Sequence, residues 1–450
     1  RNLKAVEDLN KEGLIHVTWD APLGLHGGYI DPAGLTYYIS IGSSSEDVSL
    51  GNKNYYDEQL NIKSKQEYTG YSVYAVNSSG GGREQWQTVT AIAGPALKAP
   101  MIESFKNCTM KSGPWITNMT NGEIGDAYCY AATESTVTLA QDNDGGLQTF
   151  SATALGKSVR SESPKVDIKN MKSPVLNFWA YLNGDGDELN ISVQKDYGEF
   201  VNVRRISTAE GTKGWNRFSI DLTPYKDCKF LRIGFEGKAV KNLDNFVAYD
   251  NVAIVEKATA DLMAMNIETE ERVKAGSESV VEFSFRNNTN TDVKGTDYDI
   301  VLYKNDKEVN RIDGVDIPCD MVKTVIMKDV TSVLDPEEST YHATVNYAKD
   351  ELPENNASAK NEVKILLPDY PVPTALKATA AGNHVNLAWT APDLLNRKPK
   401  VTEESFEDYK TFSIDGVGGW TMYDGDKQKT IQITLNTMFG PLKYDHAGEP

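Results

Sequence analysis

The sequence predicts an all-β protein built as a string of β-sandwich modules. Short segments alternate apolar and polar residues with a period of two, as in residues 14–19, where Ile15, Val17 and Trp19 share one face. Gly, Pro, Asn and Asp residues separate these segments, and helical patterning is weak throughout. At 450 residues the chain is too long for one hydrophobic core, so we expect several domains.

The first predicted module spans residues 1–97 and has the length of a seven-strand immunoglobulin-like sandwich. Its early VTW-x-AP segment and its late YSVYAVN-SSGGG segment resemble the second and sixth strands of a fibronectin type III domain. The resemblance implies that Trp19 and Tyr71 are core residues. Residues 98–100, Lys-Ala-Pro, follow as an expected short linker at the start of the next module.

The second predicted module, residues 98–257, contains the nearly continuous apolar run PVLNFWAYL, which is typical of a central strand covered on both faces. Five segments occur in the order IESF, SESPKV, LNFWAYLNGDGDELNISV, GWNRFSIDL and VAYDNVAI. In this order they resemble a MAM-like jelly roll, also called a cleaved-adhesin domain in gingipain-like secreted bacterial proteins. The MAM cysteine pattern is not reproduced. We interpret Trp179 and Trp215 as core residues, because both lie in strand patterns.

The rest of the chain reads as one complete module and the beginning of a repeat. Residues 258–368 resemble a CARDB-like immunoglobulin sandwich, a common spacer in bacterial cell-surface proteins. In residues 369–400, VNLAWTAP repeats the earlier IHVTWDAP and starts a second fibronectin-like unit, with Trp389 as an expected core residue. In residues 401–450, VTEESFEDY repeats PMIESFKNC and starts a second, truncated jelly roll.

The composition limits the kinds of partner. The chain carries 46 Lys and Arg against 64 Asp and Glu, a net charge of −18, which argues against nucleic acid and anionic membranes as partners. No apolar run reaches the roughly 18–20 residues of a membrane helix. The start at Arg1 and the end at Pro450 indicate a piece of a longer protein, so a signal sequence is not expected in it.

The four cysteines do not predict metal or redox chemistry, because no CxxC motif is present. Cys108 and Cys129 lie in one module and form either a disulfide or two free thiols. Cys228 and Cys319 belong to different modules and are expected to be unpaired.

Catalytic motifs are absent from the sequence. The five histidines are scattered over separate modules, and neither HExxH, GxSxG, a P-loop nor a dinucleotide-binding glycine motif occurs. We therefore predict that the chain is not an enzyme.

The resemblance to the jelly roll implies a structural calcium ion where the first and last strands meet. Glu103 in IESF and Asp250 in AYDN are then its carboxylate ligands, and Asp142 and Asp144 in the QDNDGG loop add oxygens. The alternative is that Glu103 and Asp250 are edge residues whose carboxylates accept hydrogen bonds from backbone N–H groups. Glu404, Asp424 and Asp426 are the corresponding residues of the repeat.

Three aromatic residues, Trp86, Trp115 and Tyr29, lie in irregular, polar stretches and are candidates for an exposed ligand-binding role. Such side chains stack on sugar rings. The predicted function is a non-catalytic binding or adhesion protein, secreted or at the cell surface, whose jelly roll binds glycan or an extracellular protein. Two alternatives stay open: an accessory region of a larger secreted protease, which follows from the gingipain-like resemblance, and a purely structural stalk.

Overall fold

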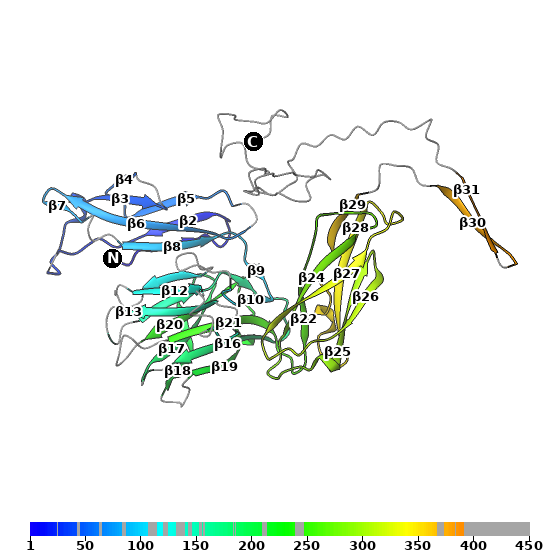
Figure 1. Ribbon diagram of the computed structural model, residues 1–450. Coiled ribbons are helices and arrows are strands. Elements are labelled where there is room, and N and C mark those ends of the chain that lie inside the picture. Colours follow the sequence, from blue (N-terminus) through cyan, green and yellow to red (C-terminus); the bar gives the residue numbers. More distant parts are fainter. Residues whose placement is uncertain are drawn as a thin grey trace, which may run out of the picture. The chain divides into compact units, whose positions relative to one another are not determined.

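The computed structural model describes residues 1–390 except 25, 43–45, 63–64, 83–86, 107–114, 120–124, 132–139, 143–145, 153–154, 156–157, 183, 185, 209–213, 239–246, 367–372 and 383. Across these residues the chain is built from strands and four short 3-10 turns, Pro32–Gly34, Thr223–Tyr225, Gly295–Asp297 and Pro353–Asn355 (Figure 1). The all-β prediction is therefore confirmed. The chain divides into two compact units, Arg1–Thr259 and Ala260–Pro450.

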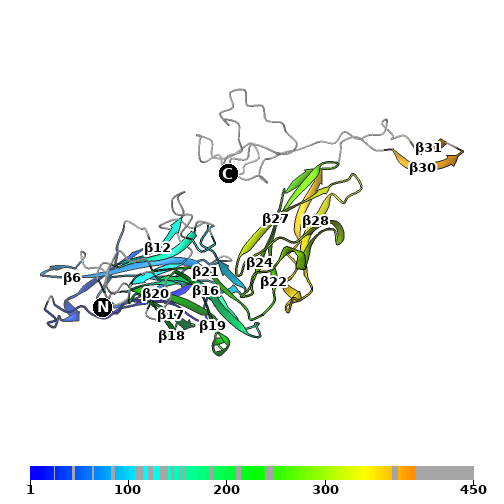
Figure 2. The same ribbon diagram turned by 60° about the horizontal axis from the view of Figure 1, so that its bottom comes forward.

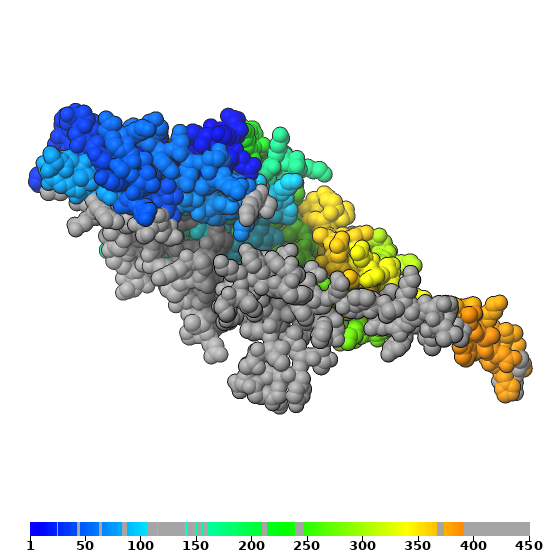
Figure 3. Space-filling view, turned by 90° about the horizontal axis from the view of Figure 1, so that it is seen from above, coloured from blue at the N-terminus to red at the C-terminus, as the bar shows by residue number. Residues whose placement is uncertain are grey.

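The first sandwich opens the first unit. One sheet contains β1 (Lys4–Glu7), β2 (Leu14–Thr18) and β5 (Tyr55–Gln59). The other contains β4 (Val48–Gly51), β3 (Thr36–Ile41), β6 (Glu67–Asn77), β7 (Gly80–Gly81) and β8 (Gln87–Ala93). Ile15, Val17 and Trp19 are at most 4% exposed, as the alternating pattern predicts, and Tyr71, which the resemblance places in the core, is fully buried. Figure 3 shows one face of this sandwich in blue.

The jelly roll completes the first unit with two sheets. The first, called the β16 sheet, contains β12 (Gly125–Ala131), β13 (Gly146–Ala152), β21 (Val247–Glu256), β16 (Pro174–Leu182), β19 (Gly214–Asp221) and β10 (Met101–Glu103). The second, called the β20 sheet, contains β11 (Ile116–Met119), β14 (Ser158–Glu162), β20 (Leu231–Lys238), β15 (Val166–Asp167), β9 (Leu97–Lys98), β17 (Glu188–Lys195) and β18 (Phe200–Ser207).

The jelly-roll core lies between these two sheets. Leu176, Phe178 and Ala180 point into it from β16, and Phe235 from β20 stacks on Tyr249 at a centroid distance of 4.0 Å. All five residues are fully buried. Alternate residues of β16 therefore face away from the core, which positions the site described below.

The third sandwich belongs to the second unit (Figure 2). One sheet contains β22 (Leu262–Thr269), β24 (Glu278–Asn287) and β27 (Val322–Val330). The other contains β23 (Arg272–Lys274), β29 (Asn361–Leu366), β28 (Glu338–Tyr347), β25 (Tyr298–Lys304) and β26 (Lys307–Asp313). Within the described part of the chain, no helix is long and apolar enough to cross a membrane.

The repeat is described only as a hairpin of β30 (Thr374–Ala381) and β31 (His384–Thr390). The prediction that Trp389 is a core residue is wrong for this hairpin, because its side chain is 57% exposed and the two strands form a sheet of their own. Residues 401–450, the predicted start of a second jelly roll with Glu404, Asp424 and Asp426, lie outside the described residues.

The cysteines are described in part. Cys228 and Cys319 are free thiols, as predicted. Cys108 lies outside the described residues, so both alternatives for Cys108 and Cys129, a disulfide or two free thiols, stay predictions.

Candidate functional site

The outward face of the β16 sheet carries a group of aromatic side chains. Strand pairing places Tyr181 opposite Trp215 and Trp179 opposite Arg217. Because Phe178, Ala180 and Leu182 are buried in the core, Trp179 and Tyr181 point to the other side, where they and Trp215 are half-buried. The rings of Tyr181 and Trp215 meet edge to face, with centroids 5.4 Å apart. We call Trp179, Tyr181 and Trp215 the aromatic face.

The prediction that Trp179 and Trp215 belong to the core is therefore wrong. The nearly continuous apolar run of β16 predicts cover on both faces. In the structure the outward residues Val175 and Asn177 are buried, whereas the outward rings further along the strand are partly exposed. These rings have both an apolar face and a polar atom, the combination that is typical of binding surfaces. Arg217 lies beside Trp179 on the neighbouring strand and adds hydrogen-bond donors at this face.

Asp250 lies on the same sheet, paired with Trp179 in register, and its side chain is fully buried. Asp250 Oδ2 accepts a hydrogen bond of 2.9 Å from the backbone N–H of Gln141, and Oδ1 accepts one of 2.7 Å from the N–H of Asn251. The Asn251 side-chain amide donates to Gln141 Oε1 at 2.8 Å. These bonds hold the turn of residues 140–142 against β21.

Glu103 ends β10, where it pairs with Val252 of β21, and its Oε1 accepts a 2.7 Å hydrogen bond from the N–H of Phe105. Asp142 follows Gln141 in the turn that contacts Asp250, whereas Asp144 lies outside the described residues. Within the described ranges, no group of three or more His, Cys, Asp or Glu residues could hold a metal ion. The carboxylates of Asp250 and Glu103 accept hydrogen bonds from backbone N–H groups, as the alternative without a metal ion expects. The calcium site stays a prediction.

Trp115 is not an exposed ligand-binding residue, and that prediction is wrong. Its side chain is 8% exposed, and its ring packs 5.7 Å from Phe105, 5.7 Å from Phe235 and 5.6 Å from Tyr249. Burial in this cluster raises the pKa of Tyr249 well above its ordinary value. Trp115 has polar neighbours in the sequence, such as Ser112 and Thr117, but these do not indicate in which direction the Trp115 side chain points.

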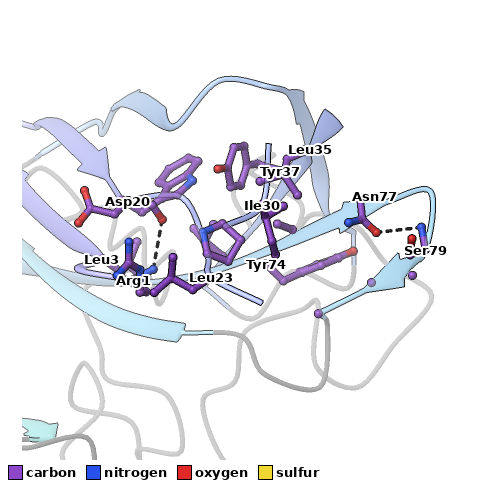
Figure 4. Close-up of a pocket in the computed structure, with 17 residues that line it drawn as sticks. Arg1, Leu3, Asp20, Leu23, Ile30, Leu35, Tyr37, Tyr74, Asn77 and Ser79 are labelled. Atoms are coloured by element: carbon purple, nitrogen blue, oxygen red, sulfur yellow. Dashed lines mark hydrogen bonds between the residues drawn. The ribbon is translucent and has the colours of Figure 1, made fainter. Parts of the chain in front are cut away.

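The first sandwich contains a pocket of about 820 Å³ beside its N-terminal residues (Figure 4). Its wall combines apolar side chains, the glycine turn 80–82 and polar groups, among them Ile30, Tyr37, Tyr74, Asp20 and Asn77. Tyr29, a predicted ligand-binding residue, precedes Ile30 and is 81% exposed. Trp86, the third predicted residue, lies outside the described part of the chain.

Together these features define a protein of β-sandwich modules with a group of partly exposed aromatic side chains on one sheet. No family model matches the sequence, and no curated protein matches it. Several solved structures are similar to single stretches of the chain. The K1 cleaved adhesin domain of Lys-gingipain from Porphyromonas gingivalis W83 is 16% identical and covers 36% of this chain and 99% of its own, with a TM-score of 0.28.

Two further solved structures are similar at the same level. A CARDB domain from Pyrococcus furiosus is 15% identical and covers 24% of this chain and 90% of its own, with a TM-score of 0.21. A carbohydrate-binding module, TmCBM61 in complex with β-1,4-galactotriose, is 14% identical and covers 34% and 94%, with a TM-score of 0.26. These likenesses concern the β-sandwich fold alone.

Proposed function

We propose that this chain is a non-catalytic binding protein, secreted or displayed at the cell surface, whose jelly roll binds glycan through the aromatic face. The observation that carries the proposal is the group of three half-buried aromatic rings on two neighbouring strands of one sheet. A half-buried ring is held in place by its neighbours and still presents apolar surface for a sugar ring. Arg217 beside it supplies donors for sugar hydroxyls.

The remaining modules are then of fibronectin III and CARDB type and position the jelly roll, which itself is of the MAM-like, cleaved-adhesin type. The alternative is that the same modules serve as the accessory region of a larger secreted protease. A peptidase domain with a Cys/His pair in the gene upstream of Arg1 would favour that alternative. If the ligand is instead an extracellular protein, we expect the chain to bind no glycan in the array experiment described below.

Replacing Trp179 or Trp215 by alanine is expected to weaken glycan binding at least tenfold. Truncating a central aromatic residue of a binding surface commonly costs more than about 1.4 kcal/mol, which is a factor of ten in Kd. The measurement is a glycan array with the full chain, followed by titration of the best-bound glycan. Tyr55→Ala is the matched control, because Tyr55 is also a partly exposed aromatic residue (49%) but lies on the first sandwich.

Two results would contradict this proposal. One is a wild-type chain that binds no glycan on the array, and the other is a Trp179→Ala, Trp215→Ala double variant that binds as the wild type does. Tyr29→Ala in the same titration tests whether this exposed ring on the first sandwich contributes to binding of the same ligand.

We further propose that the jelly roll holds one structural Ca²⁺ where the end of β10 lies beside β21, with Glu103, Asp250, Asp142 and Asp144 as its carboxylates. The donor set is all oxygen, as Ca²⁺ prefers, and the turn of residues 140–142 already rests on Asp250. Such an ion would tie the first strand, this turn and the last strand together. Its role would be structural.

Chelation is expected to lower the melting temperature of the first unit if this ion is present. A ligand at one hundred times its Kd stabilises the folded state by about 2.7 kcal/mol through mass action, which corresponds to several degrees. Thermal melting of the full chain in EDTA, with and without excess Ca²⁺, measures the shift. Asp250→Asn should abolish the difference, whereas a wild-type melting curve that EDTA leaves unchanged removes the proposal.

A further inference from the structure

A buried ion pair joins the first sandwich to the jelly roll within the first unit. Glu7, at the end of β1, and Lys165, just before β15, are 6% and 2% exposed. Glu7 Oε2 lies 2.8 Å from Lys165 Nζ and accepts a second hydrogen bond of 2.8 Å from the hydroxyl of Tyr197. Charged groups are buried at such a cost that they are rarely found without a partner of opposite charge.

Further hydrogen bonds surround this pair. The side-chain amide of Gln66 donates to the carbonyl of Lys165 and accepts from its N–H, both at 2.9 Å, so it imitates the pairing of a β-strand. Lys229 Nζ donates to the carbonyl of Leu9 at 2.7 Å. We call Glu7 and Gln66 on the sandwich, with Lys165, Tyr197 and Lys229 on the jelly roll, the docking patch.

The predicted linker is itself part of this contact. Residues 97–98 form β9, which pairs in parallel with β15 of the jelly roll. The N–H of Leu97 donates to the carbonyl of Lys165 at 2.9 Å, and the N–H of Ala99 donates to that of Asp167 at 3.1 Å. A segment hydrogen-bonded into a sheet cannot serve as a flexible joint. In Figures 1 and 2 the first sandwich lies directly beside the jelly roll.

We propose that the docking patch is a dedicated interaction surface that fuses the first sandwich and the jelly roll into one rigid binding unit. The docking patch uses the β20 sheet and its turns, whereas the aromatic face lies on the other sheet of the jelly roll. The first sandwich is thus a structural part of the binding module rather than a spacer that sets its reach.

The internal repeat shows which features the docking patch requires. When the LKA segments at 3–5 and 376–378 are aligned, Ala380 stands where the first sandwich has Glu7. The connection from β1 to β2 has six residues, 8–13, and includes Leu9, whereas that from β30 to β31 has two, 382–383. The repeat therefore lacks both the acidic side chain and the long turn that reaches Lys229. We infer that the docking patch accepts the first sandwich and not its repeat.

The two oxygens of Glu7 have separate roles, which allows a selective test. Oε1 accepts hydrogen bonds from the N–H groups of Gly13 and Gly94 at 2.7 and 2.9 Å, both within the first sandwich. Oε2 bonds only to jelly-roll residues among the contacts described, Lys165 and Tyr197. Glu7→Gln retains its one oxygen for the first role and places an NH2 group, which cannot accept a hydrogen bond, against Lys165 in the second.

The experiment is hydrogen–deuterium exchange of the full chain, read at the amides of Leu97, Ala99 and Lys165. In the wild type we expect all three to be protected, and in Glu7→Gln and Lys165→Met we expect their exchange to accelerate at least tenfold. Lys4→Ala is the matched control. Lys4 also reaches across to the jelly roll, 3.5 Å from Glu199, but this pair is exposed (63% and 90%), so its loss should leave the exchange unchanged.

The double variant Glu7→Gln, Lys165→Met keeps the test decisive when a single variant unfolds the whole unit. It contains no unpaired buried charge. The decrease in its melting temperature should therefore be smaller than the sum of the decreases in the two single variants. Strictly additive shifts, or wild-type amides at Leu97 and Ala99 that exchange as fast as those of an unstructured peptide, would overturn the docking.

Discussion

Replacing Arg286 by methionine is expected to destabilise the third sandwich by about 3–5 kcal/mol, because it leaves a buried carboxylate without its cation. Arg286 and Asp320 are both 0% exposed, and Nη2 of Arg286 lies 3.2 Å from Oδ1 of Asp320. Nη1 donates to the side-chain oxygen of Asn288, whose amide in turn donates to Asp261 at 2.8 Å. A methionine fills much of the volume but satisfies none of these acceptors.

Differential scanning calorimetry of the full chain measures this effect as a lower transition temperature of the second unit. For a sandwich of this size the loss corresponds to a shift of 10 °C or more. Arg311→Met is the matched control: Arg311 contacts Asp299 and Glu308 at 2.8 Å each, but its side chain is 45% exposed, so its loss should cost less than about 1 kcal/mol. Equal shifts for the two variants would mean that burial does not decide the strength of these pairs.

The double variant Arg286→Met, Asp320→Leu separates the ion pair from packing. When both charges are replaced by apolar groups, the desolvation cost disappears together with the attraction. We therefore expect it to be more stable than Arg286→Met alone. A double variant as unstable as the single one would show that the remaining polar groups around Asn288, rather than the carboxylate, account for the loss.

The period-two pattern was sufficient to predict the strands and the direction of many side chains. The pattern places Ile15 and Val17 on one face of residues 14–19, and both are fully buried in the structure. This works because β2 packs one face against the core and turns the other toward water, so the sequence must alternate. The two faces of such a strand are under different constraints, and the pattern records the difference.

The same argument fails for β16, where most residues of both faces are apolar or aromatic. Phe178 and Trp179 are adjacent and both aromatic, yet the first is fully buried and the second is half-buried on the outward face. A run of apolar residues does not distinguish a strand covered on both sides from one whose outer side presents rings to a ligand. The aromatic face could have been proposed only from the pairing of Tyr181 with Trp215, which sequence alone does not give.

Contacts between modules leave no local signal. Glu7 and Lys165 are separated by 158 positions, and nothing around Lys165, in the segment SESPKV, identifies it as a buried cation. The comparison of the two repeats does contain a trace, since Glu7 is replaced by Ala380 and the turn after it is shorter. Such a difference becomes informative only when the structure shows what Glu7 contacts.

Replacing Trp115 by alanine is expected to destabilise the first unit by about 3–5 kcal/mol, the usual cost of truncating a buried tryptophan. The change removes a ring that contacts Phe105, Phe235 and Tyr249 and leaves a cavity among rigid aromatic neighbours. Trp115→Phe fills part of that cavity and should cost clearly less. Tyr55→Ala removes a partly exposed ring and should stay within about 0.5 kcal/mol of the wild type.

Thermal melting and glycan titration of the same three variants separate the two roles considered for Trp115. A core residue changes the melting temperature, and binding is lost only as far as the protein unfolds. A ligand-binding residue would change the affinity and leave the melting temperature unaltered. Because Trp115 touches Tyr249, which stacks on Phe235 in the centre of the jelly roll, we expect the first result. The second would require that this aromatic cluster open to admit a ligand.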